Sequence, residues 1–195
     1  MKTFLDESKP LSTCTKETCD GCVVGQTVIC HFNLKLLMRF LMVAIPCFII
    51  AIIGICLNHW LFLIPWVLSV LLYFGLVEIR VMCSHCPHYA EPETKTLKCW
   101  ANYGSPKIWK YRPGPMSMIE NIVFFAGLAI VFLYPSVIML LSGQYILTAI
   151  YLVYTAAGFY LMNRFMCKKC MNFACPLNAV NEKTKEEFKK NNPGA

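Results

Sequence analysis

The chain has 195 residues, of which 57% are apolar and only 15% are charged, and its formal net charge is +7. Soluble domains usually carry about 25% charged residues, so this composition argues against a soluble globular protein. A protein that buries most of its surface in a bilayer explains the same numbers directly.

The N-terminal segment, residues 1–37, is polar and rich in cysteine. Its first ten residues contain four charges and no apolar stretch, so we expect no cleavable signal peptide. The run Cys14-x4-Cys19-x2-Cys22 has the first three spacings of a plant-type two-iron cluster. Cys30, Cys99 or Cys175 is available as a fourth ligand, and we predict that a cofactor is bound by Cys14, Cys19, Cys22, Cys99 and Cys175.

Two long stretches of the chain carry no charge. None of the 18 Lys and Arg or the 11 Asp and Glu lies within 40–77 or 121–163. Polar residues at 58–60 and 142–144 divide each stretch into two runs of about 20 residues, the length that crosses a bilayer core of about 30 Å. We therefore predict an all-α membrane protein with transmembrane helices at 38–57, 60–79, 119–141 and 145–165, arranged as two hairpins over 38–79 and 119–165.

Two hairpins place the remaining segments, 1–37, 80–118 and 166–195, on one side of the bilayer. Lys and Arg number five up to Arg39, six in the centre and seven from Arg164 onward. Basic residues close to membrane helices favour the cytosolic side. We expect a multi-pass protein of the cytoplasmic membrane with both termini in the cytosol.

The two hairpins end in the same motif. The second predicted helix ends in Arg80-x-Met-Cys83-x-x-Cys86, and the fourth ends in Arg164-x-Met-Cys167-x-x-Cys170. We interpret this as an internal repeat whose two-fold axis brings both motifs together at the membrane surface. Two such pairs supply the four soft ligands of a tetrahedral zinc or iron site. The predicted metal ligands are Cys83, Cys86, Cys167 and Cys170.

Ten of the twelve cysteines lie in the segments assigned to the cytosol, and only Cys47 and Cys56 lie in the predicted helices. The cytosol is reducing, which disfavours structural disulfides and favours metal ligands or catalytic thiols. Separate packed thiols and a dithiol redox pair remain open as alternatives. His85 and His88 flank Cys86, and either is a possible replacement for a thiolate ligand.

The central segment, residues 80–118, mixes aromatic and basic residues from Cys99 to Pro115. We expect this stretch to lie on the lipid surface, with a docking surface for an acidic partner or a redox-active head group as the alternative. Nucleic acid is not expected, because the segment is tethered to a membrane and lies beside cysteines. The predicted helices show no internal ionisable residue, which argues against a pump.

The leading hypothesis for function is a membrane protein that binds iron or an iron-sulfur cluster and transfers electrons at the cytosolic face. A zinc-stabilised scaffold or assembly subunit is the first alternative. Thiol redox chemistry or soft-metal handling is the second. The chain shows no motif for hydrolysis or phosphoryl transfer.

Overall fold

The structure is a computed structural model that describes residues 4–6, 8, 13–14 and 19–192. In this part of the chain the regular elements are helices, with no β-strand beyond two isolated bridges. Four helical spans are long and apolar enough to cross a membrane, as predicted: Leu34–Asn58, Trp60–His85, Met118–Leu141 and Tyr145–Lys169. The expectations for the first ten residues lie largely outside the described residues.

Three of the spans are built on single helices, and one is composite. The helices α1 (Leu34–Asn58), α5 (Met118–Leu141) and α6 (Tyr145–Phe165) run without a break. The second span joins a short 3₁₀ turn to α2 (Leu63–Leu72), a π-helical turn at Tyr73–Val77 and α3 (Glu78–Val81).

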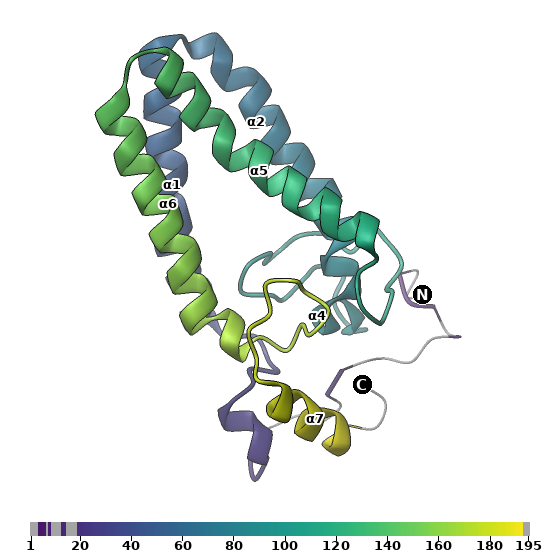
Figure 1. Cartoon of the computed structure of the whole chain (residues 1–195). Coiled ribbons are helices and arrows are strands. Elements are labelled where there is room, and N and C mark those ends of the chain that lie inside the picture. The colour runs from purple at the N-terminus through teal and green to yellow at the C-terminus, as the bar shows by residue number, and fades with distance from the viewer. Residues whose placement is uncertain (1–3, 7, 9–12, 15–18, 193–195) are drawn as a thin grey trace.

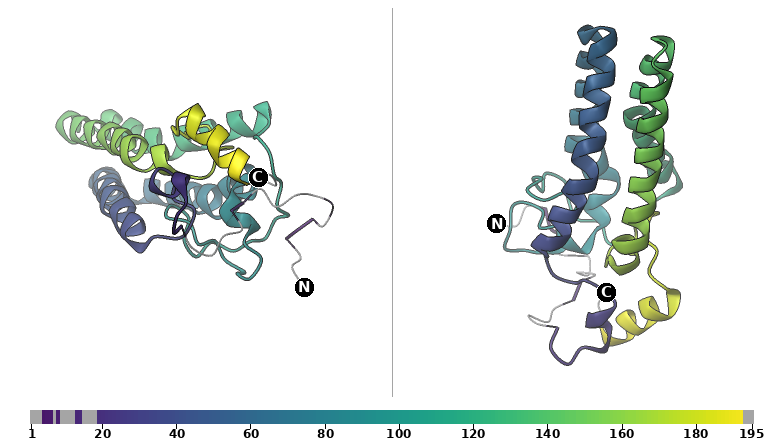
Figure 2. Two further views of the ribbon diagram at one scale, coloured as in Figure 1. Left: turned by 90° about the horizontal axis from the view of Figure 1, so that it is seen from below. Right: turned by 90° about the vertical axis from the view of Figure 1, so that its left-hand side faces the viewer.

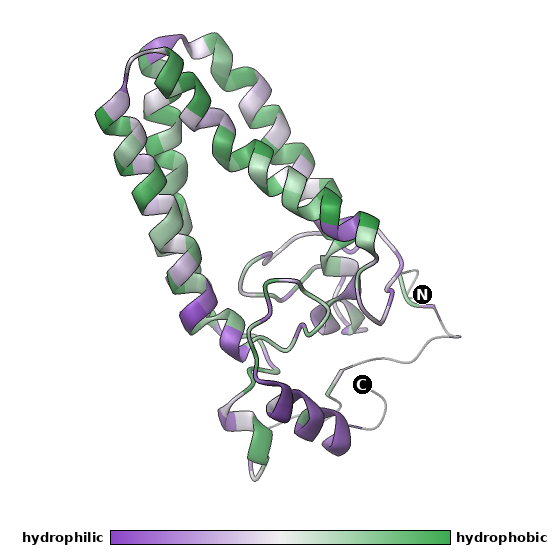
Figure 3. Cartoon of the chain, in the orientation of Figure 1, coloured by the Kyte–Doolittle hydropathy of each residue, from purple (hydrophilic) through white to green (hydrophobic). Residues whose placement is uncertain are grey.

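The spans pack as two pairs, with α1 beside α6 and α2 beside α5 (Figures 1 and 2). The pairs meet at the hairpin turns and diverge toward the opposite end, where α4 (Pro87–Ala90) and α7 (Glu182–Asn191) lie. The helices of the bundle are predominantly hydrophobic, whereas α7 is hydrophilic (Figure 3). The segments before α1, between α3 and α5, and after α6 therefore share one end of the molecule.

Polar side chains decide where α1 and α5 begin. The side chain of Asn33 accepts the backbone N–H of Lys35 at 2.9 Å, so α1 begins at Leu34 and not at residue 38. At the start of α5, Ser117 and Glu120 form a reciprocal capping box. Both helices consequently begin with polar residues at the same end of the bundle.

Neither proline inside the bundle ends its helix, as the sequence predicts for Pro46 in α1 and Pro135 in α5. Pro135 has no N–H, so the carbonyl of Val131 loses its usual helical partner. The indole Nε1–H of Trp66 donates to this carbonyl at 2.8 Å. The neighbouring helix α2 therefore satisfies the freed group, which is how membrane helices tolerate proline.

The π-helical turn lies against α5 at a glycine. The hydroxyl of Tyr73 donates to the carbonyl of Phe124 at 2.8 Å. A Cβ atom on Gly127 would overlap the Tyr73 ring, so only glycine admits the ring at this place. Such turns re-orient the residues that follow them, and the next residue, Glu78, is buried.

The two Arg-x-Met-Cys-x-x-Cys segments adopt the same backbone turn. A 3₁₀ turn forms at Cys83–His85 and another at Cys167–Lys169. Met82 has φ −119° and ψ −54°, and Met166 has φ −110° and ψ −52°. The residues that close the turns, Cys86 and Cys170, are extended with ψ 136° and 129°. The sequence motif therefore corresponds to one local structure used twice.

Candidate functional site

The ten cysteines outside the bundle core fall into two groups. We define the N-terminal thiol group as Cys14, Cys19, Cys22 and Cys30, and the central thiol group as Cys83, Cys86, Cys99, Cys167, Cys170 and Cys175. All of these cysteines are described by the structure, and all are free thiols. The central group draws on three segments that are far apart in the sequence.

Two asparagines connect the segments of the central thiol group. The side-chain amide of Asn102 donates to the sulfur of Cys83 at 3.2 Å, which joins the loop after Cys99 to the first cysteine turn. The amide of Asn172 reaches the sulfur of Met82 at 3.6 Å and joins the segment after Cys170 to the same turn. The contacts place the ends of the second and fourth spans side by side.

The thiols of the central group also influence one another electrostatically. Burial raises the pKa of Cys86 well above its usual range, and negative charge on Cys99, Cys170 and Cys175 raises it further. Burial raises the pKa of Cys175 to about 12, although an amide of Leu177 opposes the rise. A buried thiolate in this group therefore needs a positive partner to be stable.

A backbone amide opposes the rise in pKa of four of these thiols, and in each case it belongs to the residue two positions further along: His88 for Cys86, Ala101 for Cys99, Asn172 for Cys170, and Leu177 for Cys175. Cys99 receives further backbone bonds from its neighbours Trp100 and Asn102. Such donors stabilise the anionic form of sulfur, the form that ligates metals.

Two buried oxygen atoms near the central thiol group have no partner in the structure. The Oε2 atom of Glu78 and the Oδ1 atom of Asn172 accept no hydrogen bond, and these residues are only 6% and 3% exposed. The side chain of Asn102 bonds to the Glu78 carboxyl, and the carboxyl interacts electrostatically with Cys99 and Cys175. The expectation that the helices hold no internal ionisable residue is therefore wrong at Glu78.

The N-terminal thiol group is more compact in sequence and more open to solvent. The thiol of Cys30 donates to the carbonyl of Val28 at 3.9 Å, and Cys19 is exposed. Burial raises the pKa of Cys30 to about 12, and charge on the other three thiols adds to the rise. A Cβ atom on Gly25 would lie within 3.0 Å of Cys19 and 3.4 Å of Cys22, so glycine lets both side chains approach the same point.

The two thiol groups are joined by backbone contacts. The N–H of Ile29 donates to the carbonyl of Lys169 at 2.8 Å, and Ile29 forms an isolated parallel bridge with Cys170. Below this bridge, Val24 and Val28 pack with Met171, and α7 contributes Phe188 to the same small core.

The predicted site residues are distributed differently from the two sets expected from the motifs. Cys86 interacts electrostatically with Cys170, and also with Cys99 and Cys175, whereas Cys30 interacts with the N-terminal group. Among the described residues, no three His, Cys, Asp or Glu side chains take up an arrangement that could hold a metal ion. The thiols therefore lie in the same region of the described structure, but their side chains do not have the geometry of a metal site.

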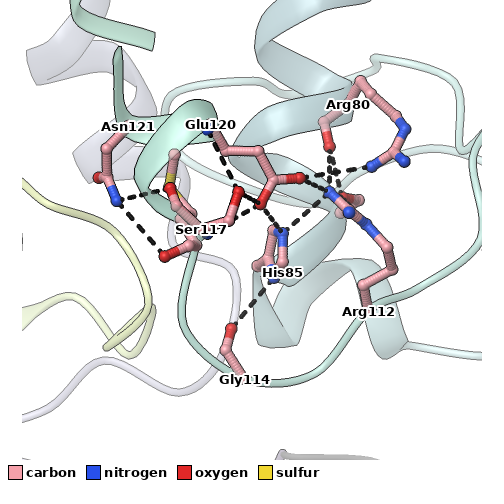
Figure 4. A network of polar contacts seen from close by, with 9 residues as sticks. Arg80, His85, Arg112, Gly114, Ser117, Glu120 and Asn121 are labelled. Carbon is pink, nitrogen blue, oxygen red and sulfur yellow. Dashed lines mark hydrogen bonds and ion pairs between the residues drawn. The ribbon is translucent and has the colours of Figure 1, made fainter. Parts of the chain in front are cut away.

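His85 is occupied by a polar network rather than directed at the thiols (Figure 4). Its Nδ1 atom lies 3.1 Å from the carbonyl of Gly114, and its Nε2 atom lies 2.9 Å from the guanidinium of Arg112. Both ring nitrogens are therefore used, as in a neutral ring that donates from Nδ1 and accepts at Nε2. His88 is buried, and burial lowers the pKa of its ring to about 4, with charges on His31 and Lys107 adding to the effect.

Glu120 is the centre of the same network (Figure 4). Its carboxylate pairs with Arg112, lies 3.7 Å from Arg80, and accepts the backbone N–H of Ser117 at 2.9 Å. The network ties the last part of the central segment to the ends of the second span and of α5. The Ser-x-x-Glu capping motif at 117–120 is the sequence signal for its start, whereas nothing local predicts that Arg112 and His85 join it.

Comparison with known proteins does not assign the chain to a family, because no family model, curated protein or solved structure matches it. The described residues define the class only as an all-helical protein with four helical spans long and apolar enough to cross a membrane.

Proposed function

We propose that this chain is a protein of the cytoplasmic membrane that binds iron or an iron-sulfur cluster at the central thiol group and transfers electrons there. Its thiol-rich end lies in the cytosol, because the Lys and Arg of the described residues lie in or next to the segments at that end and none lies within 40–77 or 121–163. An electron carrier or another protein docks on the cytosolic side.

The observation that carries the proposal is the set Cys86, Cys99, Cys170 and Cys175. These four thiols come from three separate segments and influence one another electrostatically, and the backbone amide two positions further along opposes the rise in pKa of each. Ordinary packing of reduced thiols does not require amide donors at four sulfurs. A bound cation that favours the thiolates explains both the donors and the clustering.

The donor set suits a soft metal. Sulfur ligands favour zinc, iron and iron-sulfur clusters over magnesium or calcium. Among the described residues, the buried oxygens of Glu78 and Asn172 are left without a hydrogen-bond partner, as fits a group bound beside them. When bound, iron would supply a one-electron couple, and amide bonds to its sulfur ligands are among the features that set the potential of such a centre.

The repeated turn supports a shared centre between the hairpins. Both Cys-x-x-Cys turns have the same backbone conformation and follow the second and fourth spans. Two equivalent hairpins related by an axis along the membrane normal would present their second cysteines, Cys86 and Cys170, to each other.

Anaerobic purification followed by iron and acid-labile sulfide analysis tests the proposal. We expect a coloured protein with iron bound, and visible absorption that bleaches on reduction with dithionite. A colourless protein with stoichiometric zinc and no iron would refute electron transfer at this centre.

A zinc-stabilised scaffold is the second candidate, and one observation favours it. The central thiol group joins the ends of two different spans, so a metal there would hold both hairpins together. Structural zinc contributes folding free energy outright. In this case chelation lowers the melting temperature of the detergent-solubilised protein, whereas a protein that melts identically with and without chelator excludes the scaffold.

Thiol chemistry without a metal has less support. Burial raises the pKa of Cys86, Cys99, Cys170 and Cys175, so the metal-free thiols are protonated and weakly nucleophilic at neutral pH. Rapid alkylation of all four of these thiols in the native protein would favour metal-free thiol chemistry over metal binding.

A further inference from the structure

An open pocket lies at the thiol-rich end of the bundle, between the start of α1 and the end of α6. Its volume is about 830 Å³. Leu36 and Phe165 provide apolar surface, and the segments before α1 and after α6 close the sides. The pocket therefore borders both the apolar spans and the polar end of the molecule.

The charges that line this pocket are all of one sign. Five basic residues contribute to the wall, and no lining residue is Asp or Glu; the five are Lys35, Arg39, Arg164, Lys168 and Lys169. None of the five forms an ion pair with a carboxylate in the part of the chain that the structure describes. Five like charges around one cavity repel one another, so an anion in the pocket is favoured.

The helix dipoles leave the basic residues on the α1 side of the pocket in greater need of an anion than those on the α6 side. Arg164 near the C-terminal end of α6 interacts favourably with that end of the helix dipole, and dipole compensation alone explains it. Lys35 is the second residue of α1 and faces the positive end of its helix, where a cation is unfavourable. An anion placed between the two helices compensates for Lys35, Arg39 and the N-terminal end of α1 together.

We propose that this pocket binds the phosphate head group of an anionic phospholipid, with the acyl chains lying along the apolar surfaces of α1 and α6. Basic pockets between membrane helices on the cytosolic side are typical of such recognition. Lipid is favoured over a soluble phosphate ester because the pocket opens beside residues that face the bilayer, including the exposed side chains of Leu34 and Phe165. The proposal depends on insertion of the four spans in a bilayer, but not on any metal at the thiol groups.

The pocket wall is also part of the connection between the two thiol groups. Ile29 and Lys169 line the pocket, and the N–H of Ile29 donates to the carbonyl of Lys169. Each of these residues is adjacent in sequence to a cysteine, Cys30 and Cys170. A head group in the pocket would therefore steady the contact at which the two thiol groups meet.

Native mass spectrometry of the full-length protein in detergent, titrated with phosphatidylglycerol or phosphatidylcholine, tests the proposal. We expect tighter binding of phosphatidylglycerol, and a loss of about fivefold for each pocket cation that is neutralised, since one basic residue contributes about 1 kcal/mol. The variant R39Q/R164Q/K168Q should bind phosphatidylglycerol on the order of 100-fold more weakly.

The matched control is K183Q/K189Q/K190Q, which removes the same charge from exposed positions of α7 at the same end of the molecule. It should bind phosphatidylglycerol like the natural sequence. Equal losses in both triple variants, or no loss in either, would overturn the pocket. If the pocket variant fails to fold, as judged by its helical circular dichroism, R39Q alone provides the test with its fivefold loss.

A competition experiment separates lipid from a soluble phosphate ester. Glycerol 3-phosphate and inorganic phosphate should not displace phosphatidylglycerol, because they lack the acyl chains that contact the helices. Displacement by either at concentrations similar to that of the lipid would assign the pocket to a soluble phosphate compound and refute the lipid. Metal content measured on the same samples should be equal in all variants, which keeps this test separate from the proposed metal centre.

Discussion

The two thiol groups differ in how the chain builds them. The N-terminal group comes from one short segment, its Cys19 is exposed, and its cysteines are brought together by a local turn around Gly25. The central group comes from three distant segments, and its Cys83 and Cys86 are buried. The side-chain amides of Asn102 and Asn172 connect its segments through the sulfurs of Cys83 and Met82. Assembly of the central group therefore requires the tertiary structure, whereas the N-terminal group depends mainly on the local conformation of one segment.

The largest expected effect is the loss of the metal proposed for the central group. In the variant C86S/C170S we expect the metal content per chain to fall by the whole amount bound at that centre, because two of the four proposed ligands are removed. The variant C19S/C22S should retain this metal and lose only what the N-terminal group holds. Elemental analysis of both variants after anaerobic purification makes the measurement. Equal metal loss from both variants would show that the groups form one site.

Loss of the Glu120 charge should affect only the central group. The substitution Glu120→Gln leaves Arg112 and Arg80 without their carboxylate and should destabilise this end of the bundle by about 3 kcal/mol. We expect a lower melting temperature and faster maleimide labelling of Cys83 and Cys86, with labelling of Cys19 unchanged. Glu182→Gln is the control, because Glu182 forms an exposed pair with Lys185 and such pairs contribute at most about 1 kcal/mol. Faster labelling of Cys19 as well would mean that the two groups are not independent.

The pH dependence of the unfolding free energy tests whether Lys107 in the central segment is buried. Burial lowers the pKa of Lys107 to about 8 from an ordinary value of 10.5, although charge on Glu91 opposes this. Between pH 8 and 10.5 the unfolded chain binds a proton at Lys107 that the folded chain does not. Stability contributed by this residue should therefore rise with pH across that window, by on the order of 3 kcal/mol.

The comparison of the natural sequence with Lys107→Met isolates this contribution, because the thiols titrate in both proteins. The difference in unfolding free energy should be constant below pH 8 and should change in favour of the natural sequence up to pH 10.5. Lys110→Met, at an exposed neighbouring position, should give no such trend. A flat difference across the whole range would contradict the burial of Lys107.

The smallest expected effect concerns the amide that contacts sulfur. Asn102→Leu removes the N–H bond to Cys83 and the bond to Glu78. Loss of such an outer contact typically costs about 10-fold to 100-fold in metal affinity. A competition titration with a coloured chelator measures this loss of metal affinity at the central thiol group. The affinity of the N-terminal group should not change, and a matching loss there would contradict the separation of the two groups.

The number and approximate positions of the spans could be predicted from the sequence, since hydropathy is a property of each segment alone. The uncharged stretches 40–77 and 121–163 indicate four crossings, and the structure has four apolar spans of sufficient length. Helix ends were less predictable, because the cap at Asn33 depends on one side-chain bond that moves the start of α1 to Leu34. The equivalence of the two cysteine motifs was also visible in the sequence, because a turn of four residues is determined locally.

The partition of the cysteines was not visible, because it depends on which loops meet. The sequence analysis grouped Cys99 and Cys175 with Cys14, Cys19 and Cys22, whereas in the tertiary structure the thiols of Cys99 and Cys175 interact with Cys86. The roles of Glu78, Asn102 and Glu120 depend likewise on contacts between distant segments. The basic pocket needs both ends of the chain, since Lys35 and Lys168 meet only when α1 lies against α6. The sequence by itself determined which segments form helices long and apolar enough to cross a membrane, because hydropathy is local and additive. Packing between segments decided which thiols and charges share a site, because such contacts depend on the whole fold.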